Sequence, residues 1–483
     1  MSASATTMTI ILAVVGSGTL IGLLAGRRRQ MDLEQWTVAG RGFGVVLVWL
    51  LMAGEVYTTF SLLGASGWAY SRGGPTLYIL AYMTLAYVIS FYVLPPLWEM
   101  ARAHGLQTQP DFFRECYGST MLAALVALVG VVSLIPYLQL QLTGMGIIVE
   151  VASFGSIKPK EAMAIGSVLV AGFVFSSGMR AVAWVSVMKD TLLLGVVVTI
   201  GIVLPWHWFG GIAPMFKVLM HTHPAHLTMP GGTKTMGHAW YVSTVLLTGL
   251  GAFMWPQSFG ASFTAKSAET LRCNAVLMPL YNLSLAFVLI AGFAAVLVIP
   301  GLANGDLSLL TLVSKTFPAW FLGVVGGAGA LTAMVPSAIL SLTAATLFAK
   351  NLYRPLFSPG MTDDQVAKLA RRLAIVIMIA ALGLALTSSR TIVALLLLGY
   401  TGVAQFFPGV VLGLFWRRAN LRGVTCGLFA GIIAVAFLIL TKRDPWLGMN
   451  AGFVALVLNS LVTVSVCFIG SRRPSTKSAA VEC

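Results

Sequence analysis

Long apolar stretches recur from one end of this 483-residue chain to the other, and they limit its fold more than any other feature. A helix that crosses a bilayer needs about 20 mostly apolar residues. Hydrophobic residues make up 58% of the chain and charged residues 9%, a balance that soluble domains do not have. We therefore expect an all-α polytopic membrane protein. Its roughly 13 transmembrane helices are expected near residues 8–26, 44–70, 75–98, 120–150, 161–177, 181–205, 240–263, 275–300, 316–350, 369–387, 391–416, 422–440 and 447–470.

The basic residues indicate how these helices are oriented. With the N-terminus outside, roughly 20 of the 30 Lys and Arg fall in cytoplasmic segments, as the positive-inside rule requires. We predict a multi-pass protein of the plasma membrane, the inner membrane of a bacterium, with the N-terminus outside and the C-terminus in the cytoplasm. The net charge of +15 is spread over short loops, so we expect no nucleic acid partner.

Glu55 lies in the otherwise largely apolar run Val45–Tyr70. A charge near the bilayer centre costs several kcal/mol, so it normally faces the bundle interior, an aqueous path or an ion. The small neighbours Ala53 and Gly54 favour local unwinding, which would offer main-chain carbonyls to a cation. The alternative is a protonated Glu55 that hydrogen-bonds to a neighbouring helix.

Two expected spans are interrupted by small residues or proline. The first interruption is Ala53–Gly67, and the second is Gly249–Gln257, where two glycines and Pro256 prevent a continuous helix. Broken helices in corresponding positions indicate a transporter built from an inverted repeat, with its site at the membrane midplane. We expect an extra helix and loop, a first five-helix repeat, an external loop, a second five-helix repeat and two extra helices with a tail, at residues 1–43, 44–205, 206–239, 240–416 and 417–483.

The segment Phe407–Gly423, which reads FPGVVLGLFWRRANLRG, resembles a signature of the sodium:solute symporter family, and Ser177–Trp184 resembles a second one less closely. The resemblance extends over nearly the whole chain. It implies the leucine-transporter fold with a 5+5 inverted repeat, and cation-coupled symport. Within the family, Gly54–Phe60 and Pro136–Gly144 look most like the branch that transports small monocarboxylates.

The resemblance also implies a cation site. Its two carbonyl ligands would come from Ala53 and Val56, with Glu55 at an acidic position known in the proline permeases. The family's hydroxyl pattern on the ninth span falls on residues 333–337, so Ala333 and Ser337 match, while Pro336 stands where the first hydroxyl would be. A hard cation prefers about six oxygen ligands, so the loss of one weakens a sodium site.

The sixth span carries further coupling candidates. The family's functional Asp falls at Ser186, and Lys189 and Asp190 follow one turn later on the same helical face. An intramembrane lysine needs a partner or must lose its charge. Lys189 therefore either occupies the cation site, as in some proton-coupled relatives of this fold, or forms a static ion pair with Glu55 or Asp190.

The predicted substrate residues combine positions next to the two breaks with one face of the fourth span, and their convergence follows from the family fold. Each could instead serve ordinary helix packing. They are Thr58, Thr59, Tyr137, Gln141, Trp255 and Gln257.

These observations favour a symporter that imports small monocarboxylates such as pyruvate, lactate or acetate by alternating access, coupled to H⁺ or Na⁺. The alternative is a Na⁺-coupled symporter of another small solute, such as proline or pantothenate. A membrane sensor on the same fold would need a signalling domain, which the short tail after Gly470 does not suggest.

We expect no enzyme activity, since no in-membrane His-Glu-x-x-His motif occurs, and no cofactor beyond the transported ion. The partners we expect are a small carboxylate substrate, the coupling cation and lipid, with the protein acting as a monomer. The histidines of His221–His226 have no carboxylate or cysteine nearby, so we expect no metal there. In the whole protein we expect no metal beyond a possible Na⁺ at the cation site.

Overall fold

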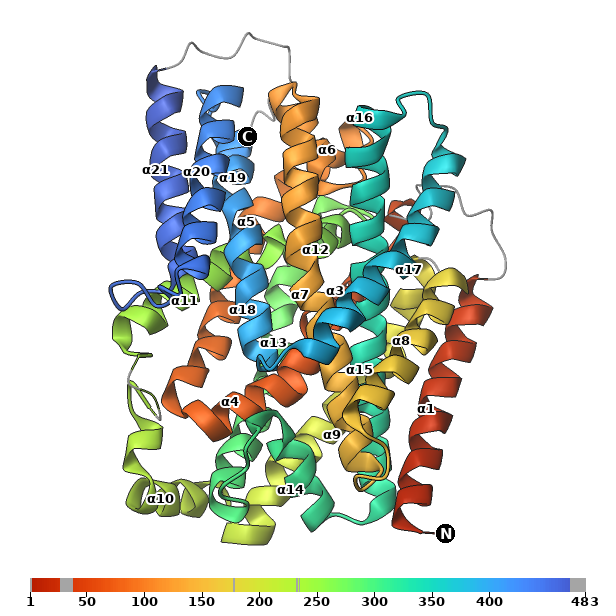
Figure 1. Ribbon diagram of the computed structural model, residues 1–483, viewed down its shortest axis with the longest axis vertical. Coiled ribbons are helices and arrows are strands. Elements are labelled where there is room, and N and C mark those ends of the chain that lie inside the picture. Colours follow the sequence, from red (N-terminus) through yellow and green to blue (C-terminus); the bar gives the residue numbers. More distant parts are fainter. Residues whose placement is uncertain (1, 27–37, 177–178, 232, 234, 470–483) are drawn as a thin grey trace.

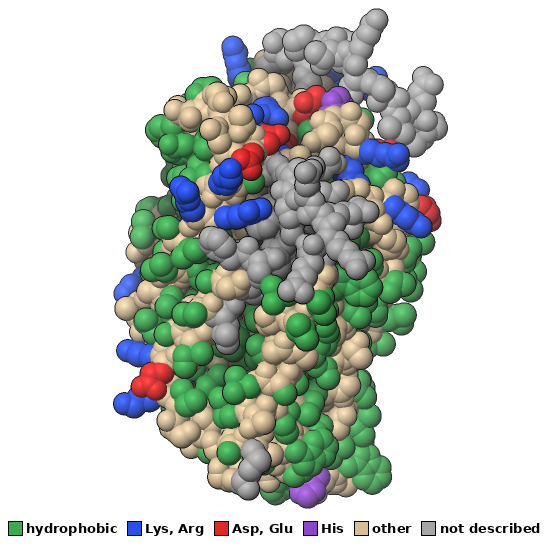
Figure 2. Space-filling model, turned by 90° about the vertical axis from the view of Figure 1, so that its right-hand side faces the viewer, with side chains coloured by type: hydrophobic (Ala, Val, Ile, Leu, Met, Phe, Trp, Pro, Cys, Tyr) green, Lys and Arg blue, Asp and Glu red, His purple; other side chains and the backbone are tan. Residues whose placement is uncertain are grey.

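The computed structural model describes residues 2–26, 38–176, 179–231, 233 and 235–469. The basic cluster Arg27–Arg29, Ser177 of the second signature-like segment, and the tail after Ile469 lie outside these ranges. The described residues form a bundle of helices, in which α1 begins at one end of the molecule and α21 finishes at the other (Figure 1). Hydrophobic side chains cover much of the flank in Figure 2, while most of the charged side chains on that face lie toward its upper part.

The longer helices form the walls of the bundle. They are α1 (Ala3–Gly26), α5 (Tyr78–Ala103), α7 (Thr120–Ala152), α8 (Pro159–Ser176), α9 (Met179–Phe209), α13 (Ala268–Val298), α15 (Ala319–Thr346), α17 (Asp363–Thr387), α20 (Leu421–Leu440) and α21 (Ala451–Ile469). The shorter helices lie at the breaks and in the loops. They are α3 (Val45–Val56), α4 (Ala65–Arg72), α6 (Gln109–Tyr117), α10 (Ile212–Thr222), α11 (His238–Gly251), α12 (Pro256–Ser262), α14 (Ser308–Thr316), α16 (Arg354–Phe357), α18 (Ile392–Val403) and α19 (Phe407–Phe415).

Among the described residues, ten helices are long and apolar enough to cross a membrane, or eleven if the bent pair α3 and α4 counts as one span. The all-helical, multi-pass class is therefore confirmed, but the count of about 13 is not. The difference has a physical cause. The breaks divide two of the expected spans, 44–70 and 240–263, into helices that are individually too short to cross a bilayer. The third expected span outside the ten is 161–177, which corresponds to α8 (Pro159–Ser176).

The first break separates α3 from α4 and bends the chain by 58°. Tyr57 has an extended backbone (φ −90°, ψ 90°), and a π-helical turn, Phe60–Gly64, leads into α4. The second break follows α11, where Trp255 is extended (φ −60°, ψ 127°) before Pro256 begins α12. A proline disfavours the helical conformation in the residue before it, so Pro256 accounts for this break. Both interruptions predicted from the sequence are thus present.

Glycines on α15 allow α1 to pack closely against it. A Cβ atom at Gly323, Gly326 or Gly327 would lie 2.6–2.9 Å from side-chain atoms of Ile10, Ile11 or Val14. Helices in a bilayer associate mainly by van der Waals packing, and small residues at the contact bring their backbones together. This contact holds the N-terminal helix against the core of the bundle.

Candidate functional site

Lys189 of α9 points at the broken end of α3. Its side chain is fully buried, and its Nζ donates hydrogen bonds of 3.0 Å to the carbonyl oxygens of Gly54 and Tyr57. Where a helix ends, its last carbonyls lack partners within the helix and carry the negative end of the helix dipole. The break therefore creates a small set of oxygen acceptors, and the lysine ammonium occupies it.

Asp190 lies next to this ammonium. The distance from Lys189 Nζ to Asp190 Oδ1 is 2.9 Å, and both side chains are fully buried. The hydroxyl of Tyr281 on α13 donates to the same oxygen at 3.1 Å, while Asp190 Oδ2 has no hydrogen-bond partner among the described residues. The Tyr281 ring packs 4.1 Å from the ring of Tyr57, at the break itself. A Lys–Asp–Tyr cluster thus joins α9, α13 and the α3 break.

Gly54 makes this approach of α9 to α3 possible. A Cβ at position 54 would lie 2.7 Å from the Ser186 hydroxyl oxygen and 3.6 Å from Lys189 Nζ. Ser186 itself donates to the carbonyl of Val182 at 3.0 Å, within its own helix. Sequence reasoning noted Gly54 only as a small neighbour of Glu55, and its role as a contact surface for α9 depends on the tertiary structure.

The predicted cation ligands have other partners in this structure. The Ala53 carbonyl accepts the Tyr57 N–H at 2.8 Å, and the Val56 carbonyl accepts the Ser61 hydroxyl at 3.3 Å. On α15, the Ser337 hydroxyl donates to the Ala333 carbonyl at 2.7 Å. The ammonium is therefore held by the carbonyls of Gly54 and Tyr57 rather than those of Ala53 and Val56. A cation site made of the predicted ligands stays a prediction.

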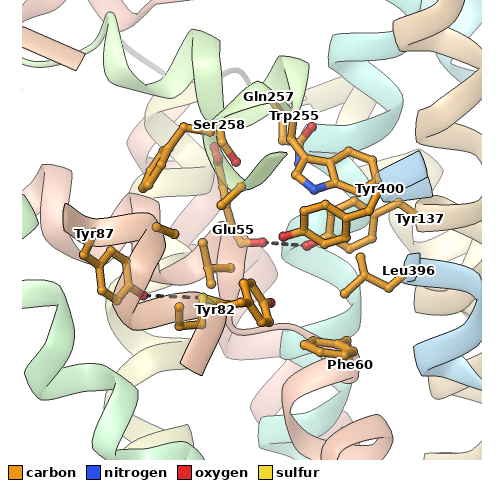
Figure 3. Close-up of a pocket in the computed structure, with 15 residues that line it drawn as sticks. Glu55, Phe60, Tyr82, Tyr87, Tyr137, Trp255, Gln257, Ser258, Leu396 and Tyr400 are labelled. Carbon is orange, nitrogen blue, oxygen red and sulfur yellow. Dashed lines mark hydrogen bonds between the residues drawn. The ribbon is translucent and has the colours of Figure 1, made fainter. Parts of the chain in front are cut away.

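Glu55 lies apart from the lysine cluster. It is 3% exposed, and among the described residues it forms no ion pair with Lys189 within 4.0 Å. Its main-chain carbonyl accepts the Tyr137 hydroxyl at 2.9 Å. Among the described residues, neither oxygen of the Glu55 carboxylate has a well-formed hydrogen bond, although the Ser258 hydroxyl lies next to the group (Figure 3). Of the two ion-pair partners considered for Lys189, the structure selects Asp190.

Glu55 lines a cavity of about 20 Å³, which has room for one water molecule. The cavity lies between the two breaks and the helices α5, α7 and α18 (Figure 3). No described Lys, Arg or His lines it, so Glu55 is the one charged side chain among the described lining residues. The lining residues are Glu55, Val56, Phe60, Tyr82, Met83, Ala86, Tyr87, Tyr137, Ala252, Phe253, Trp255, Gln257, Ser258, Leu396 and Tyr400.

Three of the predicted substrate residues line this cavity: Tyr137, Trp255 and Gln257. The rings of Tyr137 and Trp255 lie 4.7 Å apart. The other three, Thr58, Thr59 and Gln141, do not line it.

Thr59 and Gln141 instead join α7 to the first break, because the Thr59 hydroxyl donates to Gln141 Oε1 at 2.7 Å. The Thr58 hydroxyl oxygen accepts the Phe60 N–H at 3.3 Å.

The cavity lining also contains Tyr82, Tyr87 and Tyr400. Sequence reasoning missed these three residues, because they stand in ordinary apolar runs with no local signal.

Two carboxylates outside the spans hold the ends of the site-forming helices. Asp306, in a short 3₁₀ turn (Gly305–Leu307), accepts the Ile392 N–H at the start of α18 at 3.0 Å and packs against Gly67 of α4. Burial raises its pKa to about 6, although the hydrogen bond from Ile392 acts in the opposite direction. Asp306 thereby ties α4 to α18, the helix that carries Leu396 and Tyr400 of the cavity.

Asp111 of α6 lies at the opposite end of the molecule. Lys350 Nζ is 2.7 Å from Asp111 Oδ2, and Asn351 donates to Oδ1 at 2.9 Å. Burial alone would raise the pKa of Asp111, but Lys350 and the hydrogen bonds hold it below its ordinary value. The neighbouring Gln109 donates to the Met254 carbonyl at 3.0 Å, so α6 is attached directly to the second break.

Comparisons with known proteins agree with this geometry. The sequence profile of the sodium:solute symporter family matches residues 36–431. The chain is 45% identical to the "uncharacterized symporter YhjB" of Bacillus subtilis, over 98% of both chains. It is 29% identical to the "monocarboxylate transport permease protein" of Rhizobium johnstonii, over 87% of this chain and 86% of that one. The fold resembles the substrate-bound outward-open state of a Na⁺-coupled sialic acid symporter, with a TM-score of 0.80, 17% identity and coverage of 97% and 98%. The chain therefore belongs to the sodium:solute symporter family.

Proposed function

We propose that this protein imports small monocarboxylates, such as pyruvate, lactate or acetate, together with a cation. The coarser part of this statement, cation-coupled solute symport, follows from membership of the family. The similarity to the monocarboxylate permease supports the substrate class. A small cavity between two broken helices is where a transporter of this kind binds its substrate.

We propose further that protons, rather than sodium, drive the transport. The buried Lys189 ammonium on the Gly54 and Tyr57 carbonyls is the observation that carries this proposal. One ammonium already supplies the positive charge that a coupling cation would bring to the end of α3. Transfer of its proton toward Asp190 would leave a neutral amine with a weaker hold on both carbonyls. The broken helix could then move relative to α9, and the equilibrium between inward and outward states would shift.

The cavity of this structure has room for one water molecule, so it has to widen before it can take a carboxylate substrate. Glu55 has to be neutral when an anionic substrate occupies the widened cavity. Two like charges 4 Å apart repel by about 4 kcal/mol at an effective dielectric of about 20, and the lining offers no cation in compensation. A protonated Glu55 would instead present a hydroxyl donor to the carboxylate, beside the hydroxyls of Ser258 and the tyrosines. We therefore assign to Glu55 a second proton-binding role in the loaded state.

The test is uptake into proteoliposomes with the proton gradient or the sodium gradient imposed alone. Wild-type protein should accumulate labelled pyruvate, lactate or acetate when only the pH gradient is present, and Lys189→Met should lose this accumulation. Lys315→Met, at an exposed lysine on α14, is the matched control. Sodium-driven accumulation at symmetric pH, unchanged in Lys189→Met, would leave the proton model without support.

A Na⁺-coupled symporter of another small solute, such as proline, is the second candidate. One observation favours it, because a carboxylate without hydrogen-bond partners beside several aromatic rings suits a substrate with an ammonium group. Competition separates the two candidates. Accumulation of labelled proline or a related amine that none of the three acids inhibits would reject the monocarboxylate assignment.

We also propose the topology that the basic residues favour. The N-terminus would lie outside and the C-terminus in the cytoplasm of a bacterial inner membrane, with five-helix repeats at residues 44–205 and 240–416 in a functional monomer. Single cysteines near the start of α1 and after α16, in a cysteine-free background, test the orientation. Only the first should react with an impermeant thiol reagent in intact cells.

A further inference from the structure

A groove of about 750 Å³ lies between α7, α17, α18 and α20, away from the site already described. Its volume is within the range of small-molecule binding sites. Four of its wall residues are half exposed: Leu128 (46%), Val132 (57%), Leu384 (48%) and Phe429 (48%). All four stand on helices that are long and apolar enough to cross the membrane. The groove therefore opens sideways, toward the hydrocarbon of the bilayer.

The groove walls suit a hydrocarbon chain rather than a polar ligand. Most of the lining residues are aliphatic, and the polar side chains deep in the walls already have partners in the protein. Gln139 donates to the Leu384 carbonyl, Thr401 to the Leu398 carbonyl and Gln405 to the Thr401 carbonyl. An apolar space of this kind is not filled by ordered water, since water needs polar partners.

Among the described residues, one charged residue lines the groove, and it lies at one end. Arg390 is exposed in the short connection between α17 and α18, beside Thr387 and Ser388. Lys442 and Arg443 follow the end of α20, and the Arg443 guanidinium stacks on Phe437, the residue after Ala436 of the lining. The Asp444 carboxylate lies close enough to Arg390 to interact with it electrostatically. Three basic groups against one acidic group leave this end positive, as a phosphate requires.

We propose that this groove binds a membrane phospholipid, with an acyl chain between α7, α18 and α20 and its phosphate at Arg390. The bound chain would lie against the outer face of the wall that encloses the cavity. Within that wall α7 and α18 touch, because a Cβ at Gly399 would lie 3.0 Å from the Ser133 carbonyl and 2.4 Å from Trp255. The lipid would therefore stabilise the two helices that supply Tyr137 and Tyr400 to the cavity.

The test uses the full chain in vesicles of phosphatidylglycerol that contain a trace of the same lipid with a diazirine on one acyl chain. After illumination, the modified residues are mapped by mass spectrometry. We expect adducts concentrated on groove residues such as Leu398 and Phe429. Val132→Trp, which fills the groove, should reduce them about tenfold, equivalent to about 1.4 kcal/mol of binding free energy. Val376→Trp is the matched control, since Val376 is 58% exposed on α17 but does not line the groove.

The phosphate contact is tested in the same assay. Arg390→Gln should lower the groove adducts, while Lys315→Gln, at an exposed lysine outside the groove, should leave them unchanged. Both tryptophan substitutions are at exposed positions, so folded protein is expected, and gel filtration checks it. Adducts spread evenly over all exposed helices, or insensitive to Val132→Trp, would overturn the proposal. Protection of the groove by a second copy of the chain, seen as cross-links between chains and no lipid adducts, would overturn it as well.

Discussion

Removal of the Lys189 ammonium is the perturbation with the most specific consequences. Lys189→Met keeps the length and apolar volume of the side chain but takes away the positive charge. Asp190 would then be a buried, unneutralised carboxylate, and the carbonyls of Gly54 and Tyr57 would lose their donor. Breaking a buried ion pair by removing one partner costs about 3–5 kcal/mol. We expect a loss of unfolding free energy of that size.

A second substitution separates the charge from the lost packing. Asp190→Asn in the Lys189→Met background removes the unpaired charge, so the double variant should be more stable than Lys189→Met alone. Residues in direct contact typically show a coupling free energy of about 0.5–3 kcal/mol, and this buried pair should fall in the upper half of that range. The cycle compares wild type, Lys189→Met, Asp190→Asn and the double variant. Their unfolding in the same detergent, followed by tryptophan fluorescence, measures it.

Sodium provides a further readout that an ordinary packing defect would not give. In Lys189→Ala, the carbonyls at the end of α3 are free to bind a cation. At a sodium concentration tenfold above the dissociation constant, binding would stabilise the variant by RT ln 11, about 1.4 kcal/mol. Wild-type protein should show no such effect, because its own ammonium holds the position. The reasoning is refuted if Lys189→Met unfolds within about 0.5 kcal/mol of wild type and sodium stabilises Lys189→Ala and wild type equally.

Three further predictions concern carboxylates. Glu55→Gln should fold normally but fail to concentrate substrate in proteoliposomes, because the amide cannot exchange a proton. Accumulation by the folded variant at the level of wild type would exclude a coupling role for Glu55. For Asp306, the pKa is about 6 in the folded protein and 3.8 ordinarily. Ionisation of Asp306 therefore destabilises the fold by 1.36 × (6 − 3.8), about 3 kcal/mol. This penalty is fully present above pH 6 and absent below pH 3.8. Asp306→Asn, which keeps an acceptor for the Ile392 N–H, should therefore raise the unfolding free energy at pH 8 and lose this advantage at pH 4; equal effects at both pH values would contradict it. Asp111 has the opposite sign, because a lowered pKa stabilises the fold above the ordinary value and this stabilisation is lost as the pH falls through the lowered pKa. Lys350→Met should lower stability at pH 7 and flatten the acid limb of the stability profile, measured by unfolding from pH 7 to pH 3.

The sequence alone determined the class of the protein, its broken helices and its family. These features are local, because a run of apolar residues selects a membrane helix and Pro256 forces the residue before it out of the helical conformation. The cap of α17 is local as well. Thr362 and Gln365 form a capping box in which each side chain accepts a main-chain N–H of the other residue. The count of spans was less accurate, because length and hydropathy alone do not show that an expected span is divided.

Only the tertiary structure decided which partners the buried charges have. Lys189 had two candidate carboxylates. The packing of α9 against Gly54 placed its ammonium on the carbonyls of Gly54 and Tyr57, where it pairs with the adjacent Asp190 and leaves Glu55 at the cavity. The aromatic lining from Tyr82 and Tyr400 was not predictable for the same reason. Residues more than 300 positions apart meet there through helix packing, and neither leaves a periodic or compositional signal near itself in the chain. A titratable residue in an apolar run shows that the group needs a partner, an ion or a neutral form, because an unpaired buried charge is too costly, but only the fold shows which of these it has.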